Sequence, residues 1–448
     1  MPQALDALTK SLLTAALKAG ADAADAKAVE ATSTAVDVRG GVLEQAERSE
    51  GVEIGLRVFV GQRSVCVSAS DTSERTIEEM ALRAVAMAGE APEDPHCGLA
   101  DPDQLAQSWD SDALELFDQT PEPSAQALQE DAARAEAAAL AVEGVTQSQS
   151  ASAGYSAQTM YVAMTNGFEG GYARTSRGLS SVAIAGTGTS MERDYDGDSR
   201  VFQADLRTPE EIGQTAGLRA VARLGARKPP TGSYPVVFDE RIASSLIGHL
   251  LGAINGAAVA RGASFLRDAL GKAVLPDGMS LIEDPHRPRA SGSRPFDGEG
   301  LATARRVIVE DGVLLGWTVD LANARKLGVA PTGNGARGTG SAPSPGNWNI
   351  GLSQGEQSQA DLLRDMGTGL LITSMIGSTI NPNTGDYSRG ASGMWVENGV
   401  AVHPINECTV AGNLKEMLRA VIPANDARPH LSRVVPSLMI PEMTLAGA

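Results

Sequence analysis

Residues 52–60 read Val-Glu-Ile-Gly-Leu-Arg-Val-Phe-Val, with an apolar residue at every second position. This period of two is that of a β-strand, whose side chains point alternately to its two faces. The alternation continues through residues 25–70, with interruptions at Gly40-Gly41 and Gly61-Gln62. Glycine at such breaks suits tight hairpin turns. Residues 25–70 therefore predict an antiparallel meander.

Helical patterns flank this meander. Leucines recur at helical spacing over residues 3–18, and Gly20 follows as a stop. After the strands, Ser73 can cap a helix that runs to Met87 and ends at Gly89. The expected order is helix, strands, helix.

The same order returns in the next stretch of sequence. It comprises an Ala-rich helix over 124–142, strands over about 146–205 broken at Asn166-Gly167 and Gly170-Gly171, and a helix over 209–225. The two closing helices share Leu-Arg-Ala-Val-Ala, at 82–86 and 218–222. We interpret this as an internal duplication, with Leu82 and Leu218 in equivalent buried positions.

The pattern of predicted strands and helices changes beyond the linker Lys-Pro-Pro-Thr-Gly at 228–232. A short strand at 235–238 precedes an apolar helical stretch over 241–270 that several glycines interrupt. Two later hairpins have the turn pairs Asp311-Gly312 and Asn398-Gly399, which favour tight turns.

The predicted fold class is α+β. A duplicated helix–antiparallel-sheet–helix domain is expected over residues 1–228, with repeats at about 1–94 and 121–228. A mainly β domain with a Gly-rich helix is expected over 233–448.

Composition excludes several classes of function. Net charge is 37 − 55 = -18, and aromatic residues make up only 4%, so neither a basic surface for nucleic acid nor a stacking platform is expected. Cys66, Cys97 and Cys408 are too few and too scattered for a disulfide framework. The chain has no apolar stretch long enough to span a bilayer. Asp6 and Lys10 within the first apolar stretch predict an amphipathic helix there and not a signal peptide. We expect a cytoplasmic protein.

Familiar motifs are degenerate. Residues 333–338 fit Gly-x-Gly-x-x-Gly, but no strand precedes and no helix follows, as a dinucleotide site requires. Asp194, Asp196 and Asp198 alternate, but the Gly and Glu of a calcium loop are missing, so an acidic hairpin turn is predicted. No His-Glu-x-x-His is present.

Several stretches nevertheless resemble the TldD/PmbA (TldE) family, also called modulators of DNA gyrase. The resemblance covers essentially the whole chain and favours the PmbA/TldE branch. The matching stretches are 294–300 (Arg-Pro-Phe-Asp-Gly-Glu-Gly), 326–335 (Lys-Leu-Gly-Val-Ala-Pro-Thr-Gly-Asn-Gly), 381–393 (Asn-Pro-Asn-Thr-Gly-Asp-Tyr-Ser-Arg-Gly-Ala-Ser-Gly) and 409–414 (Thr-Val-Ala-Gly-Asn-Leu).

The resemblance implies a two-subunit cytoplasmic metallopeptidase that cuts unfolded peptides. In the TldD branch a His-Glu-x-x-x-His helix follows a Pro-Val-Val strand. Two imidazoles hold zinc there, and the glutamate takes a proton from the bound water. In this sequence Pro-Val-Val at 235–237 places Gly248, His249 and Ala253 on the three motif positions. Glycine and alanine have no side-chain ligand.

The resemblance therefore implies a metal-free, non-catalytic subunit, with no catalytic or metal-binding residue of its own. The implied partner is a zinc-containing TldD-like subunit in a heterodimer, and a homodimer is expected when that partner is absent. The expected ligand is unfolded peptide, with no direct contact to nucleic acid or membrane. The candidate cleft residues are His249, Asn334, Arg337, Asp386 and Arg389.

Two other functions stay open at this point. An autonomous hydrolase would need a pair such as Cys408 with His403, or Asp386 with His249. A homodimeric peptide-binding or regulatory module would need no enzyme partner.

Overall fold

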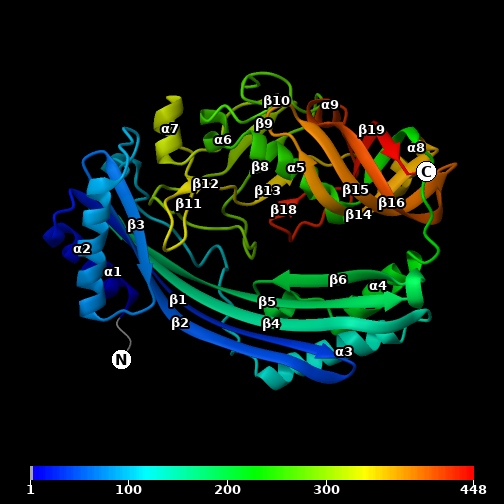
Figure 1. The fold of residues 1–448 in the computed structure, drawn as a ribbon, viewed down its shortest axis with the longest axis horizontal. Coiled ribbons are helices and arrows are strands. Elements are labelled where there is room, and N and C mark those ends of the chain that lie inside the picture. The colour runs from blue at the N-terminus through cyan, green and yellow to red at the C-terminus, as the bar shows by residue number, and fades with distance from the viewer. Residues whose placement is uncertain (1–3, 448) are drawn as a thin grey trace.

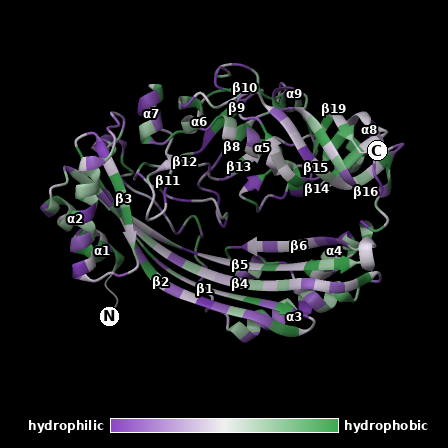
Figure 2. Cartoon of the chain, in the orientation of Figure 1, coloured by the Kyte–Doolittle hydropathy of each residue, from purple (hydrophilic) through white to green (hydrophobic). Residues whose placement is uncertain are grey.

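The computed structural model in Figure 1 describes residues 4–447, apart from the side chain of Ser378. A long, curved sheet forms one layer, with helices on its convex side and a β-rich part facing its concave side (Figure 1). Polar and apolar residues alternate along the long strands, as Figure 2 shows. This architecture is α+β, as predicted.

The curved sheet is antiparallel, with strand order β3-β2-β1-β4-β5-β6. Its strands are β1 (Ala23–Arg39), β2 (Val42–Val60), β3 (Arg63–Ala69), β4 (Val145–Met164), β5 (Glu169–Ala185) and β6 (Glu192–Arg200). The helices on it are α1 (Leu5–Ala19), α2 (Glu74–Glu90), α3 (Ala125–Leu140) and α4 (Pro209–Ala222). The order α-β-β-β-α thus occurs twice, and the two units join where β1 pairs with β4.

The repeated Leu-Arg-Ala-Val-Ala string lies at matching places in α2 and α4. Ala84 and Ala220 are both fully buried. Leu82 and Leu218 are also equivalent, but their exposed fractions are 62% and 55%, so the prediction that they are buried is wrong. Each helix lies so close to the sheet that only the small alanine side chain fits between them, and the leucine therefore points to solvent.

Most predicted turns are confirmed. The hairpins of the first unit turn at Gly40-Gly41 and Gly61-Gln62, between the bounds of β1, β2 and β3. The predicted break at Gly170-Gly171 is wrong, because β5 runs straight through it. A Cβ on Gly170 would lie 2.7 Å from the Trp109 ring, so glycine is needed there for close packing and not for a turn.

The second part of the chain begins after the predicted linker, with β7 (Gly232–Phe238), α5 (Glu240–Ala253) and α6 (Gly256–Ala260). Its main sheet contains β14 (Gly369–Ile380), β15 (Asp386–Glu397), β16 (Val400–Asn413), β17 (Ile422–Pro423) and β19 (Leu438–Ala446) together with β7. Since β16 also pairs with β19, the main strands close on themselves. The predicted Gly-rich helix over 241–270 is shorter than expected and ends at Ala260.

A second, smaller sheet has the order β10-β9-β8-β13-β18. The remaining elements are β8 (Leu281–Glu283), β9 (Arg306–Glu310), β10 (Val313–Leu314), α7 (Leu321–Leu327), β11 (Gly335–Ala336), β12 (Ser344–Pro345), β13 (Ile350–Leu352), α8 (Gln359–Met366), α9 (Leu414–Arg419), β18 (Arg433–Val434) and the 3-10 turns at Pro102–Gln104, Gly188–Ser190 and Gln203–Asp205. Both predicted hairpin tips are confirmed, with Asp311 and Asn398 in left-handed conformations. Within residues 4–447, no helix is both long and apolar enough to cross a membrane.

Candidate functional site

Helix α5 holds Gly248, His249 and Ala253, the positions on which the family resemblance would place the zinc motif. It follows β7 directly and is capped by Asp239, whose side chain accepts the backbone N–H of Arg241. Its apolar side lies in the largest hydrophobic core, where Leu246, Ile247 and Leu250 are at most 1% exposed. Local capping and this apolar side fix the orientation of the motif positions.

Two of the three motif positions carry no ligand atom, as the sequence shows. The Cβ that any larger residue would place at Gly248 lies 3.2 Å from Nη1 of Arg433, so a guanidinium occupies the space beside this position. Ala253 is buried at the end of the helix. These residues do not fit a zinc ion. Gly248 and Ala253 supply neither of the two histidine ligands of the motif, and the Arg433 guanidinium places a positive charge beside Gly248.

His249 is half-buried at the middle position. Its ring packs edge-on against Tyr387, with 5.8 Å between ring centroids, and its Nε2 is buried without a hydrogen-bond partner. Burial lowers the pKa of His249, and the charge of Arg389 lowers it further. The imidazole is therefore neutral at pH 7.

Arg389 is the second cation beside this histidine. Its Nε donates to the carbonyl of Gly377 at 2.7 Å. Burial raises the pKa of Tyr387 to about 12, although Arg389 opposes this shift. The surroundings of His249 thus carry positive charge from Arg389 and Arg433. Metal ligation would need anionic or neutral donors there instead.

The residues of the two alternative hydrolytic pairs are not brought together. Cys408 donates its thiol to the carbonyl of Ala391 at 3.1 Å, and burial raises its pKa to about 11, so it is protonated at neutral pH. His403 faces Trp395 on the neighbouring strand. Asp386 is exposed and bonded to Thr384 and Asn413. No hydrogen bond or ion pair joins Cys408 to His403 or Asp386 to His249 in the part of the chain that the structure describes.

Asn334 and Arg337, two of the candidate cleft residues, lie in a buried polar network instead. The amide of Asn334 donates to the carboxylate of Glu283 and to the carbonyl of Gly346. Arg337 forms an ion pair with Asp25 of β1, and Arg57 of β2 binds the other carboxylate oxygen. Their surroundings indicate a role in fixing the 331–346 loop on the curved sheet.

The 294–300 stretch organises the same loop. Asp297 accepts the backbone N–H groups of Gly335, Glu299 and Leu301 at 2.8–3.0 Å. Glu299 accepts the N–H of Leu321, at the start of α7. Burial raises the pKa of Asp297 to about 6 and that of Glu299 to about 8, with their mutual repulsion adding to the Glu299 shift.

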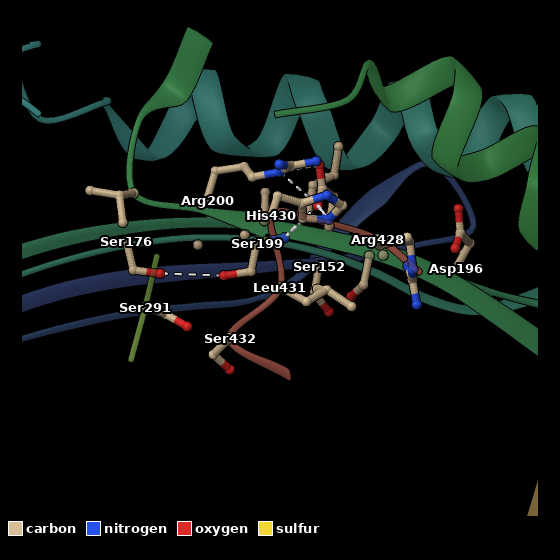
Figure 3. A pocket seen from close by; sticks show the side chains of 18 of the residues that line it. Ser152, Ser176, Asp196, Ser199, Arg200, Ser291, Arg428, His430, Leu431 and Ser432 are labelled. Atoms are coloured by element: carbon tan, nitrogen blue, oxygen red, sulfur yellow. Dashed lines mark hydrogen bonds and ion pairs between the residues drawn. The ribbon is translucent and has the colours of Figure 1, made fainter. Parts of the chain in front are cut away.

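A cavity of about 620 Å³ lies between the concave face of the sheet and the segment 428–432. Small side chains from adjacent strands form its floor, and the hydroxyls of Ser176 and Ser199 lie 3.4 Å apart there (Figure 3). Arg428 and His430 lie over the floor (Figure 3). No sequence motif predicts this cavity. Its only sequence signal is the Ser/Gly/Ala alternation along β4 and β5, which is also compatible with an ordinary solvated face.

The three alternating aspartates form part of β6, so the predicted acidic turn is wrong. All three carboxylates are at most 6% exposed and are paired with arginines. Asp196 binds Arg207 and Arg219, whereas Asp194 reaches Arg241 of α5. Asp198 pairs with Arg200 of β6 itself, whereas the other arginines come from later parts of the chain. Together they neutralise a cluster that looks strongly acidic in the sequence.

The fold consists of two helix–sheet–helix units on one curved sheet that face a β-rich part. Comparison with known proteins places a chain of this fold in a metallopeptidase-like class. The chain belongs to the PmbA/TldA metallopeptidase family, also written PmbA/TldD. Family models match over 24–88 (domain 1), 118–224 (central domain) and 231–447 (C-terminal domain).

Individual relatives agree with this assignment. The chain is 38% identical to "Metalloprotease PmbA" of Escherichia coli O157:H7, over 95% of this chain and 92% of that protein. Among solved structures, a Bacteroides thetaiotaomicron protein named as a modulator of DNA gyrase is 28% identical, with a TM-score of 0.91 over 99% of this chain and 98% of the other. TldE from Thermococcus kodakarensis shares the fold, with a TM-score of 0.84 at 19% identity, over 98% and 100%.

Proposed function

We propose that this chain is the metal-free, non-catalytic subunit of a cytoplasmic two-subunit peptidase that acts on unfolded peptides. The observation that carries the proposal is the set Gly248, His249 and Ala253 on α5, with the Arg433 guanidinium against the first position. A site built this way lacks the donors for zinc and cannot activate water by metal coordination.

The partner in this proposal is a TldD-like subunit that supplies the zinc and the catalytic glutamate. This chain would complete the channel and present the peptide. Three unpaired cysteines support a reducing compartment. A Cys408 thiol with a pKa of about 11 is no nucleophile at neutral pH, which counts against an autonomous thiol hydrolase.

The test measures zinc content and cleavage of an unfolded peptide, first with this chain alone and then after mixing with the TldD-like subunit of the same organism. We expect no stoichiometric zinc and no cleavage alone, and zinc-dependent cleavage in the mixture. About one zinc per chain, with chelator-sensitive activity of the isolated protein, would refute the proposal. Sedimentation of the chain alone should show a homodimer, and a stable monomer at micromolar concentration would contradict that part.

A further inference from the structure

One border of the curved sheet is left unpaired over the first part of β2. β2 pairs with β1 along nearly its whole length, but β3 covers it only from Ile54 to Val60. Residues 42–53 therefore have no second neighbour along this border (Figure 1). All of them except Val52 are exposed, so no loop covers them. At about 3.3 Å per residue this free edge is roughly 40 Å long.

Every second residue of such an edge directs its backbone N–H and C=O away from the sheet. An extended chain can pair with these groups and add a strand. We propose that the 42–53 edge of β2 binds an extended, lysine- or arginine-rich peptide by strand addition. This inference rests on the proposed handling of unfolded peptide and specifies where this subunit holds it and what sequence it prefers.

The other strand edges in residues 4–447 are less suitable. Side chains occupy backbone groups of β6 at Tyr195: Asp194 of β6 accepts the N–H of Tyr195, and Arg219 of α4 donates to its carbonyl. β3 has only seven residues. In the main C-terminal sheet β16 pairs with β19 only over Thr409–Ala411, and β14 pairs with β7 only over Leu370–Ile372. The remaining stretches, 373–380 of β14 and 400–408 of β16, carry a single charged residue, Glu407, and Pro404 has no N–H to donate. The border strands β10 and β18 have two residues each.

The charge of the 42–53 edge favours a basic peptide. The edge carries Glu44, Glu47, Glu50 and Glu53, all exposed, against the single Arg48. Arg48 is itself bound to Glu122 and Glu50. A second copy of this chain, paired along the same edge, would set one acidic strand against another, and like charges across a strand pair are destabilising. A basic peptide meets the glutamates favourably while it uses the same backbone groups.

The test uses the purified chain with no partner and no zinc, so its outcome is independent of the activity test above. Three fluorescent peptides of equal length are titrated at low salt: a Thr-Lys repeat, a Thr-Glu repeat, and the Thr-Lys repeat with every backbone nitrogen methylated. We expect binding of the first peptide only. Methylation keeps the charges but removes the N–H donors, so equal binding of the methylated peptide would overturn strand addition.

Site-specific variants locate the contact. Glu47→Lys with Glu50→Lys should weaken Thr-Lys binding on the order of tenfold or more. The control, Glu90→Lys with Glu143→Lys, makes the same change in net charge at exposed positions elsewhere and should bind like the wild type. Hydrogen exchange of the wild-type chain should show new amide protection within residues 42–53. Protection confined to another segment, or equal loss of binding in both variants, would refute the proposed site.

Discussion

Asp25 and Arg337 form an ion pair in which both side chains are completely buried, although 312 positions separate them in the sequence. Arg57 binds the same carboxylate through its Nε at 2.6 Å. Lys27 donates to the carbonyl of Arg337 at 2.8 Å. The 331–346 loop of the C-terminal part is thus fixed to the first strands of the curved sheet, and Asp25 is the anion shared by two buried guanidinium groups.

Removal of this anion should be strongly destabilising. Asp25→Ala leaves Arg57 and Arg337 buried side by side without a counter-charge, and we expect it to lower the free energy of unfolding by about 3–5 kcal/mol. Urea denaturation followed by circular dichroism measures the change. Lys18→Ala, which breaks the exposed pair with Glu78, is the control and should unfold like the wild type. Equal effects of the two variants would contradict the role of the buried pair.

Glu299 should make stability fall as pH rises. Its pKa is raised from 4.5 to about 8 in the folded state, mainly by burial and then by Asp297. Between about pH 4.5 and 8, the folded protein therefore holds a proton on Glu299 that the unfolded chain has already released. Its contribution is complete below pH 4.5 and is lost as the pH rises through 8. One such group gives a slope of up to about 1.4 kcal/mol per pH unit.

Glu299→Gln keeps the shape of this side chain and removes the titration. We expect a flatter dependence of the free energy of unfolding on pH between 5 and 8, measured by denaturation at several pH values. Glu90→Gln, at an exposed position, should keep the wild-type slope. If Glu299→Gln also keeps it, the carboxyl group is not protonated in the folded state.

Restoring the zinc motif should not restore a zinc enzyme. Gly248→His, His249→Glu and Ala253→His together supply two imidazoles, one fewer than the three protein ligands usual at catalytic zinc. The buried Ala253 position resists a larger side chain, at a cost of about 1–3 kcal/mol. Zinc titration of the triple variant should show weak uptake, and peptide assays should show little or no turnover.

Adding Arg433→Ala to the triple variant should strengthen zinc uptake, because it removes the cation beside position 248. The single Arg433→Ala variant is the control and should take up no more zinc than the wild type. Tight zinc binding and cleavage by the triple variant with Arg433 intact would mean that a third ligand is already in place and that our description of this cleft is wrong.

Two helical glycines should respond oppositely to alanine. A Cβ on Gly213 of α4 would lie 1.9 Å from the carbonyl oxygen of Ala135 in α3, so Gly213→Ala must push the two helices apart, and we expect a loss of about 1–3 kcal/mol. Nothing lies within 4 Å of a Cβ on Gly252, which is exposed in α5. Gly252→Ala should therefore stabilise the helix by about 0.5–1 kcal/mol. Thermal unfolding of both variants checks the contrast, and a loss in both would contradict it.

The sequence by itself determined those features whose causes are local. The β1-β2-β3 meander follows from the period of two in residues 25–70 and from the glycine turns at 40–41 and 61. Both signals are local, because side-chain alternation and positive φ depend only on neighbouring residues. The hairpin turns at Asp311-Gly312 and Asn398-Gly399 can be predicted from the sequence for the same reason. The chemistry of the degenerate motif was also visible, since Gly248 and Ala253 lack ligand atoms wherever they lie.

Only the tertiary structure decided features whose causes lie far away in the chain. Gly170 looked like a turn because its actual neighbour, the Trp109 ring, cannot be inferred from nearby residues. The β6 aspartates looked like an acidic loop because most of their arginine partners lie outside β6, including Arg241 of α5. Arg337 was expected in the cleft, but its ion-pair partner Asp25 lies 312 positions away in the sequence. Burial and long-range ion pairing depend on which surfaces meet, and a one-dimensional pattern does not record that.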